Sequence, residues 1–307
     1  MAGVSTMFVV LAALCWGLSG GIGGMLVAEG WDPTVVSFYR GAIGLVFVLI
    51  WLGLRQRRSG LTKVRVWLWS IIAGLGVAGN FTFYFISISE GSIAVAATLM
   101  YCAPVFVYLI SFALKLEEPN AGKWISIIMV MVGIVMLTRI YNIDAGGVTM
   151  VGIATGLLSG LSYALFIFGF KYAGPYGSPQ AILVIAFAVL TGILVVLGDT
   201  AQIAGVPRSH SWPLFAILGL IGGGLSFILY IVGLRNTAPA VASVVAMIEP
   251  VTASLFGVVV FQERLAGLQI FGMILILITV TGLSVSSRIQ KIWWRRKRIK
   301  PLIRNIV

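Results

Sequence analysis

The sequence predicts an all-α integral membrane protein in which ten transmembrane helices form two inverted five-helix repeats. Three observations lead to this fold class: an apolar composition, a division into ten apolar runs, and an internal duplication. Hydrophobic residues make up 60% of the 307 residues and charged residues only 10%, whereas a soluble domain carries about 25% charged residues. The chain therefore lacks the surface of a soluble domain but has enough apolar length for many spans.

Glycine, proline and polar residues separate ten apolar runs. Each run is long enough to cross a bilayer, which takes about 20 residues, and inside the bilayer a helix satisfies its own backbone hydrogen bonds. The expected spans are 5–27, 35–54, 66–88, 92–114, 122–139, 149–171, 179–198, 212–234, 239–260 and 266–286. The first run has no basic segment before it and is too long for a signal peptide, so we interpret it as the first span.

The internal duplication is marked by two prolines, Pro104 and Pro250, that lie 146 residues apart. Glu117 and Glu263 follow them at the same spacing. In the ungapped alignment of 80–117 with 226–263, identical pairs include Phe81/Phe227, Tyr84/Tyr230, Ala94/Ala240, Val95/Val241, Ala96/Ala242, Val105/Val251 and Leu109/Leu255. Repeats of this kind are typical of transporters, which bind substrate at the repeat interface.

Lysine and arginine predict the orientation. They are concentrated in two blocks beside apolar spans, which favours a role in topology over nucleic-acid binding. One block is Arg55, Arg57, Arg58, Lys63 and Arg65, and the other is Arg288, Lys291, Arg295, Arg296, Lys297, Arg298, Lys300 and Arg304. The loops on the opposite side carry only Arg139, Arg208 and Arg264. Both termini are therefore expected in the cytoplasm.

Each half contains five spans, an odd number, so the two halves must be inverted relative to each other. The expected division is a first repeat at 1–145, a second repeat at 146–287 and a basic cytoplasmic tail at 288–307. Two interpretations of the tail stay open, an interfacial helix on the anionic leaflet and a disordered segment.

Chemistry-bearing residues are sparse. Cys15 and Cys102 lie within apolar runs and are expected to be packing residues, while His210 is the only histidine. The match to G-x-G-x-x-G at 74–79 falls inside an apolar span and lacks the strand that a dinucleotide site needs. We therefore expect no metal, no cofactor and no enzymatic activity.

Three features stand out within the spans. Pro104 and Pro250 are expected to kink their helices, to free backbone carbonyls and to act in gating. Glu249 precedes Pro250, and a carboxylate facing lipid there would cost about 3 kcal/mol or more. It must face protein or water, either as a proton-coupling or ammonium-binding site or as a structural cap. Arg40 is expected to reach the surface and pair with Glu29 or Asp32, leaving a cavity without buried cations.

Polar and aromatic residues recur at equivalent repeat positions. Asn80 and Tyr84 share one helix face, and Ser226 and Tyr230 occupy the matching positions. The expected substrate-binding residues are Trp16, Asn80, Tyr84, Tyr101, Tyr163, Ser226, Tyr230, Met247 and Glu249. A water-filled cavity with aromatic walls would satisfy their polar edges, and ordinary helix packing is the alternative for each residue singly.

The repeat signature resembles the drug/metabolite transporter superfamily, and within it the EamA-type branch. The resemblance rests on Ala94, Ala97, Pro104, Leu109 and Glu117 and on Ala240, Val241, Pro250, Leu255 and Glu263. It covers nearly the whole chain and looks most like the YddG-type exporters of aromatic and neutral amino acids. The resemblance implies a central cavity lined by spans 1, 3, 4, 6, 8 and 9.

These observations favour an inner-membrane exporter of amino acids or related metabolites, working by alternating access as a monomer. A cavity without cations would suit a zwitterion, with Asn80 and Ser226 as hydrogen-bond partners of its carboxylate and amine. Proton coupling and facilitated diffusion both stay open. The alternatives are an exporter of other metabolites or lipophilic drugs and a membrane scaffold without transport.

Overall fold

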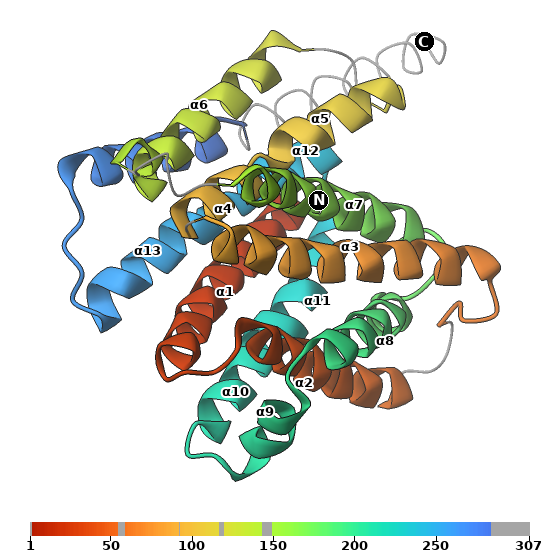
Figure 1. The fold of residues 1–307 in the computed structure, drawn as a ribbon. Helices are drawn as coiled ribbons and strands as arrows, with labels where there is room; N and C mark the ends of the chain where they lie inside the picture. Colours follow the sequence, from red (N-terminus) through yellow and green to blue (C-terminus); the bar gives the residue numbers. More distant parts are fainter. Residues whose placement is uncertain (1, 55–58, 92, 117–119, 143–148, 284–307) are drawn as a thin grey trace, which may run out of the picture.

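The computed structural model of the chain describes residues 2–54, 59–91, 93–116, 120–142 and 149–283 (Figure 1). Its helices are α1 (Ala2–Ala28), α2 (Pro33–Leu54), α3 (Val64–Ser89), α4 (Ile93–Met100), α5 (Ala103–Ala113), α6 (Ala121–Thr138), η1 (Ile140–Asn142), α7 (Met150–Ala173), α8 (Pro179–Leu197), α9 (Thr200–Gly205), η3 (Val206–Arg208), α10 (Trp212–Leu218), η4 (Gly219–Leu225), α11 (Ser226–Leu234), α12 (Pro239–Ala246) and α13 (Ile248–Val260). Glu117 and the basic tail lie outside these residues.

The ten-span, two-repeat fold is confirmed. Within the described residues, nine segments are long and apolar enough to cross a membrane, and the shorter apolar helix Gly267–Leu283 provides the tenth. Three spans are composite: α4 with α5, α10 with η4 and α11, and α12 with α13. The outer faces expose large apolar side chains, among them Ile50 and Val196, as contact with lipid requires.

Two loop contacts are made by equivalent residues of the two repeats. The Asp32 backbone N–H donates to the Gln202 side-chain oxygen at 2.9 Å, and the Ser178 N–H donates to the Ser59 carbonyl at 2.9 Å. Asp32 and Ser178 are 146 positions apart, and each precedes the proline that opens its helix, α2 or α8. Each loop thus docks on the opposite repeat, as a two-fold axis in the membrane plane requires.

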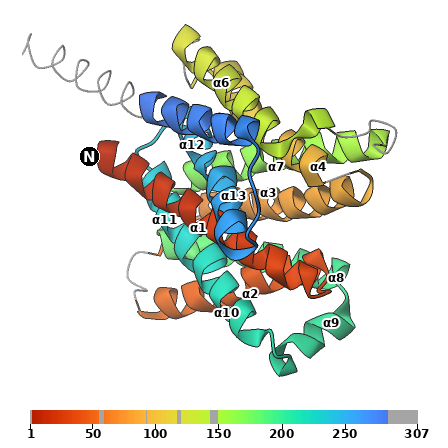
Figure 2. The same cartoon turned by 90° about the vertical axis from the view of Figure 1, so that its left-hand side faces the viewer.

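The same symmetry governs helix packing. The helix α3 packs along α7, while α1 packs against α11 and α13 (Figures 1 and 2). Glycine makes these approaches possible: a Cβ on Gly169 would lie 2.8 Å from the Cα of Ala73, and one on Gly233 would lie 2.7 Å from the Ser5 carbonyl oxygen. Small residues of this kind let membrane helices pack backbone to backbone.

Helix breaks occur at equivalent places in the fourth and ninth spans. The helix α4 ends at Met100 and α12 ends at Ala246, each four residues before a proline. A proline ring clashes with the carbonyl group four residues before it, and proline has no N–H to donate to that carbonyl. The backbone turns similarly at both breaks, with φ −69° and ψ −4° at Cys102 and φ −69° and ψ 3° at Met247.

The eighth span contains a π-helix, η4 (Gly219–Leu225), between α10 and α11. Three of its residues, Gly222 to Gly224, are consecutive glycines. A wider turn of this kind shifts which side chains face inward and is frequent at functional sites. The run of glycines is visible in the sequence, but a run of glycines does not by itself predict a π-helix.

Candidate functional site

An aromatic cluster lies where the two repeats meet. Its centre is Trp16 on α1, whose ring centroid lies 4.8 Å from that of Tyr230 and 5.2 Å from that of Phe227, both on α11. The Tyr163 and Phe166 rings on α7 lie edge-on to Trp16 at 6.4 and 6.3 Å. One helix of the first repeat and two of the second therefore supply the walls.

The polar edges of this cluster have no protein partner. Within the described part of the chain, the Trp16 indole N–H and the hydroxyls of Tyr163 and Tyr230 are buried without a hydrogen bond. Each such group costs about 1–3 kcal/mol if it stays unpaired. Three such atoms on residues that pack together make this cluster a candidate binding site for water or a polar solute.

Glu249 lies in the first turn of α13, directly after the break at Met247. The break places a helix N-terminus inside the protein, and a carboxylate there is stabilised by the helix dipole, typically by about 0.3–1 kcal/mol. The side chain is half-buried. It interacts electrostatically with Arg40 of α2, so it lies within reach of a charged group on another span.

Four tyrosines lie close enough to this carboxylate to interact with it electrostatically. Glu249 interacts electrostatically with the hydroxyls of Tyr84, Tyr101, Tyr163 and Tyr230. These hydroxyls come from α3, the α4–α5 break, α7 and α11, so five spans contribute to one site. The structure thus brings most of the predicted site residues together.

Arg40 faces inward, which corrects the expected pairing with Glu29 or Asp32. Its Nε donates to the Gly222 carbonyl of η4 at 3.1 Å, and its guanidinium lies 5.2 Å from the centre of the Phe81 ring. It also interacts electrostatically with Glu249. The expectation of a cavity without buried cations was therefore wrong.

Glycine explains why Arg40 can take this position. A Cβ on Gly223 would collide with the Arg40 carbonyl, and one on Gly222 would lie 2.9 Å from Arg40 Nε. The contact between α2 and η4 therefore requires glycine at 223, while glycine at 222 leaves room for Ser19 of α1 and for the Arg40 side chain. Sequence reasoning missed Arg40 as a site residue; the available signal was its charge within an otherwise apolar run.

Asn80 and Ser226 have protein partners. The Asn80 side-chain nitrogen donates to the carbonyl and hydroxyl oxygens of Ser159 at 3.1 and 3.0 Å, and the Ser159 hydroxyl donates to the Asn80 carbonyl at 2.9 Å. The Ser226 hydroxyl donates to Gly222 O at 2.6 Å. These bonds brace α3 against α7 and close one turn of η4. Met247 is fully buried at the helix break.

The fold and site together define a multi-pass membrane protein with an internal polar site between inverted repeats. Residues 4–139 and 150–285 each match the EamA-like transporter family. The chain belongs to this family of transporters.

Relatives and a solved structure share this architecture. The chain is 25% identical to the uncharacterized transporter YwfM of Bacillus subtilis over 298 residues, which cover 94% of this chain and 96% of the relative. An uncharacterized transporter of Archaeoglobus fulgidus is 29% identical over 81% of this chain and 85% of its own length. Protein PecM of Dickeya dadantii is 24% identical, with 77% and 79% covered. A crystal structure with a TM-score of 0.72 and 19% identity, covering 93% of this chain and 96% of its own, shares the fold.

Proposed function

We propose that this protein exports amino acids or similar small zwitterions across the bacterial inner membrane. The observation that carries the proposal is the presence of opposite charges, Arg40 and Glu249, in one aromatic-walled site. An α-amino acid needs an anion near its ammonium group and a cation near its carboxylate. The site contains both, together with apolar surface for a side chain.

Each site residue has a role in this proposal. Glu249 binds the ammonium group, and Arg40 binds the carboxylate with the N–H groups that do not bond Gly222. The rings of Trp16, Tyr163 and Tyr230 enclose the side chain, and their unpaired polar edges orient the bound molecule. Further lining comes from Tyr84, Tyr101 and Met247, whereas Asn80 and Ser226 hold the helices that carry the site.

Transport by alternating access requires the site to open to either side in turn. The breaks before Pro104 and Pro250 divide the two spans that the repeat relates, so each half-helix can tilt without unwinding the other. The concentration of basic residues supports a cytoplasmic position for both termini and for the loop with Lys63, under the positive-inside rule.

A second candidate is export of lipophilic cations, favoured by Glu249 among aromatic rings. Counterflow in proteoliposomes separates the two. Vesicles loaded with unlabelled phenylalanine should accumulate labelled phenylalanine, and other neutral amino acids should compete. Counterflow of an aromatic cation with no competition by amino acids would establish the second candidate instead.

Proton movement is tested with the same vesicles. If Glu249 binds a proton and the substrate's ammonium group in turn, a pH gradient should accelerate wild-type transport. Glu249→Gln should abolish this acceleration. Equal rates with and without the gradient would assign the protein to facilitated diffusion.

A further inference from the structure

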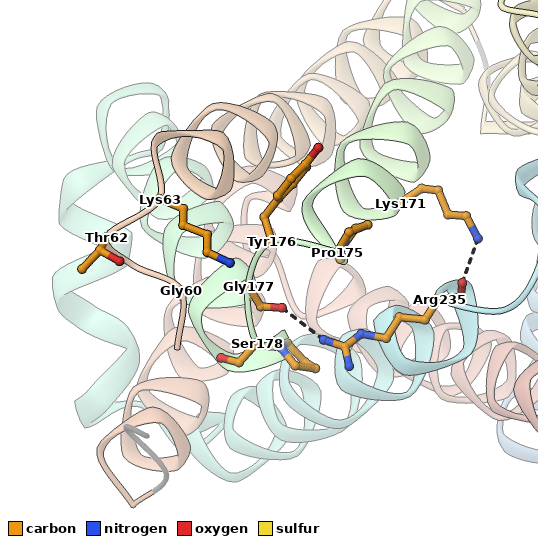
Figure 3. Close-up of a pocket in the computed structure, with 11 residues that line it drawn as sticks. Gly60, Thr62, Lys63, Lys171, Pro175, Tyr176, Gly177, Ser178 and Arg235 are labelled. Carbon is orange, nitrogen blue, oxygen red and sulfur yellow. Dashed lines mark hydrogen bonds between the residues drawn. The ribbon is translucent and has the colours of Figure 1, made fainter. Parts of the chain in front are cut away.

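A second polar site lies at one end of the bundle, apart from Glu249. It is a pocket of about 960 Å³ between the α2–α3 loop, the α7–α8 loop and the end of α11 (Figure 3). Its lining consists of Gly60, Thr62, Lys63, Lys171, Gly174, Pro175, Tyr176, Gly177, Ser178, Pro179 and Arg235. Three of these residues are cationic, and none of the described lining residues is acidic.

Hydrogen bonds hold the walls of this pocket in place. The Arg235 guanidinium donates to the Gly177 carbonyl at 3.1 Å, and Lys171 Nζ donates to the Arg235 carbonyl at 3.1 Å (Figure 3). Lys171 Nζ also donates to the Leu234 and Thr237 carbonyls at 2.7 Å each. Gly60, at φ +79°, lets the first-repeat loop approach the Tyr176 carbonyl more closely than a Cβ would allow. The pocket is thus a built feature at a contact between the two repeats.

The three cations differ in what they can offer a ligand. Lys171 donates to three carbonyls, counting that of Arg235, and so contributes charge more than new hydrogen bonds. Lys63 and Arg235 are exposed, and Arg235 donates only one of its five N–H groups to Gly177. A phosphate group between Lys63 and Arg235 would receive hydrogen bonds from both repeats.

The position of the pocket favours a lipid as the source of that phosphate. The pocket lies at the start of α3 and α8 and at the end of α7 and α11, where spanning helices reach the headgroup layer. Beside it, Trp67 is 47% exposed and donates its indole N–H to the Leu61 carbonyl at 2.8 Å. A tryptophan with one wet and one apolar edge is typical of the membrane interface.

We infer that this pocket binds the phosphate of an anionic phospholipid headgroup. Basic pockets between spanning helices suit such headgroups, and bound lipid would bridge the two repeats at this end of the bundle. The inference is independent of which solute the protein transports. It predicts selective retention of phosphatidylglycerol over phosphatidylcholine.

Native mass spectrometry of the purified full chain in detergent, titrated with each lipid, tests the inference. Phosphatidylglycerol should bind in preference to phosphatidylcholine. The double substitution Lys63→Gln with Arg235→Gln should weaken binding by roughly 25-fold, because each cation near the surface contributes about a fivefold attraction. Lys63→Gln alone leaves the Arg235–Gly177 bond intact and should weaken binding about fivefold. The control Lys115→Gln removes an exposed lysine outside the pocket and should bind as wild type.

Inorganic phosphate and glycerol 3-phosphate provide a second arm. If they displace the lipid at millimolar concentration and lose this ability in Lys63→Gln, the phosphate site stands and its ligand is a soluble phosphate. If the variants retain phosphatidylglycerol as the wild type does, the inference is overturned. Transport of phenylalanine in pure phosphatidylcholine vesicles tests the proposed function separately.

Discussion

Arg40 Nε donates a hydrogen bond to the Gly222 carbonyl at 3.1 Å and so joins α2 of the first repeat to the π-helix of the second. The bond fixes the direction of the guanidinium, which then faces the Glu249 side of the site. A positive group that would otherwise be costly inside a membrane is retained because it has both a carbonyl partner and an aromatic face.

Arg40→Lys should therefore fail to replace arginine. Lysine keeps the charge but cannot bond Gly222 and a substrate carboxylate in the same planar geometry. We expect the KM for a transported amino acid to rise at least about tenfold, and Arg40→Gln to behave similarly or worse. Counterflow rates over a range of substrate concentrations measure the effect. Normal kinetics in Arg40→Lys would mean that the guanidinium does not contact substrate.

Gly223→Ala should disrupt the approach of α2 to the π-helix. The added Cβ would collide with the Arg40 carbonyl, and overpacking of this kind costs about 1–3 kcal/mol. The thermal unfolding midpoint in detergent should fall, together with transport. Gly192→Ala is the matched control, because a Cβ there meets nothing within 4 Å. An equal response of the two variants would contradict the packing argument.

Removing an unpaired hydroxyl should lower the transport rate without lowering thermal stability. Tyr230→Phe and Tyr163→Phe delete buried oxygens that have no described protein partner, so thermal stability should stay equal or rise slightly. Transport should fall several-fold if these oxygens contact substrate. A large loss of stability would show instead that protein groups or structural water depend on them.

Ser159→Ala should lower stability without changing substrate preference. Ser159 exchanges hydrogen bonds with Asn80 between α3 and α7, so its loss should destabilise the fold by about 1–3 kcal/mol. Substrate preference should not change, because neither residue is proposed to touch substrate. Altered selectivity in Ser159→Ala with unaltered stability would return Asn80 to the binding site.

Pro250→Ala should allow α12 and α13 to join. Alanine supplies the missing N–H and removes the ring that clashes with the Ala246 carbonyl. Glu249 would then lose its place at a helix N-terminus, so exchange should slow. Pro104→Ala disrupts the equivalent break without moving Glu249 and should slow transport while sparing substrate affinity. Identical effects on affinity in both variants would argue against a special role for the second break.

Much of the fold follows from the sequence because apolar length and the repeat each act over whole segments. Ten spans and the two-repeat architecture are confirmed on this basis. The aromatic cluster of Trp16, Tyr163 and Tyr230 was also among the expected site residues. All three side chains combine an apolar ring with a polar edge that needs a partner. This property belongs to the residue type, so it can be recognised from the sequence.

Side-chain direction was not predictable in the same way. Arg40 lies near one end of its span, where snorkelling to the surface is the ordinary outcome. Its inward direction depends on the glycines of a π-helix far away in the sequence. Asn80 looked like a ligand-binding residue, but its partner Ser159 belongs to the other repeat. Such tertiary pairings have no local sequence signal.

In the proposed mode of binding, Glu249 and Arg40 contact the two charged ends of one zwitterion. The decisive measurement is competition in phenylalanine counterflow by two analogues, 2-phenylethylamine, which lacks the carboxylate, and 3-phenylpropanoate, which lacks the ammonium group. Each analogue should compete at least about tenfold less well than phenylalanine, since each leaves one charge of the site unpaired. Glu249→Gln should reduce the difference in competition between phenylalanine and 3-phenylpropanoate. Equal competition by 3-phenylpropanoate and phenylalanine in the wild type would show that Glu249 does not bind the ammonium group.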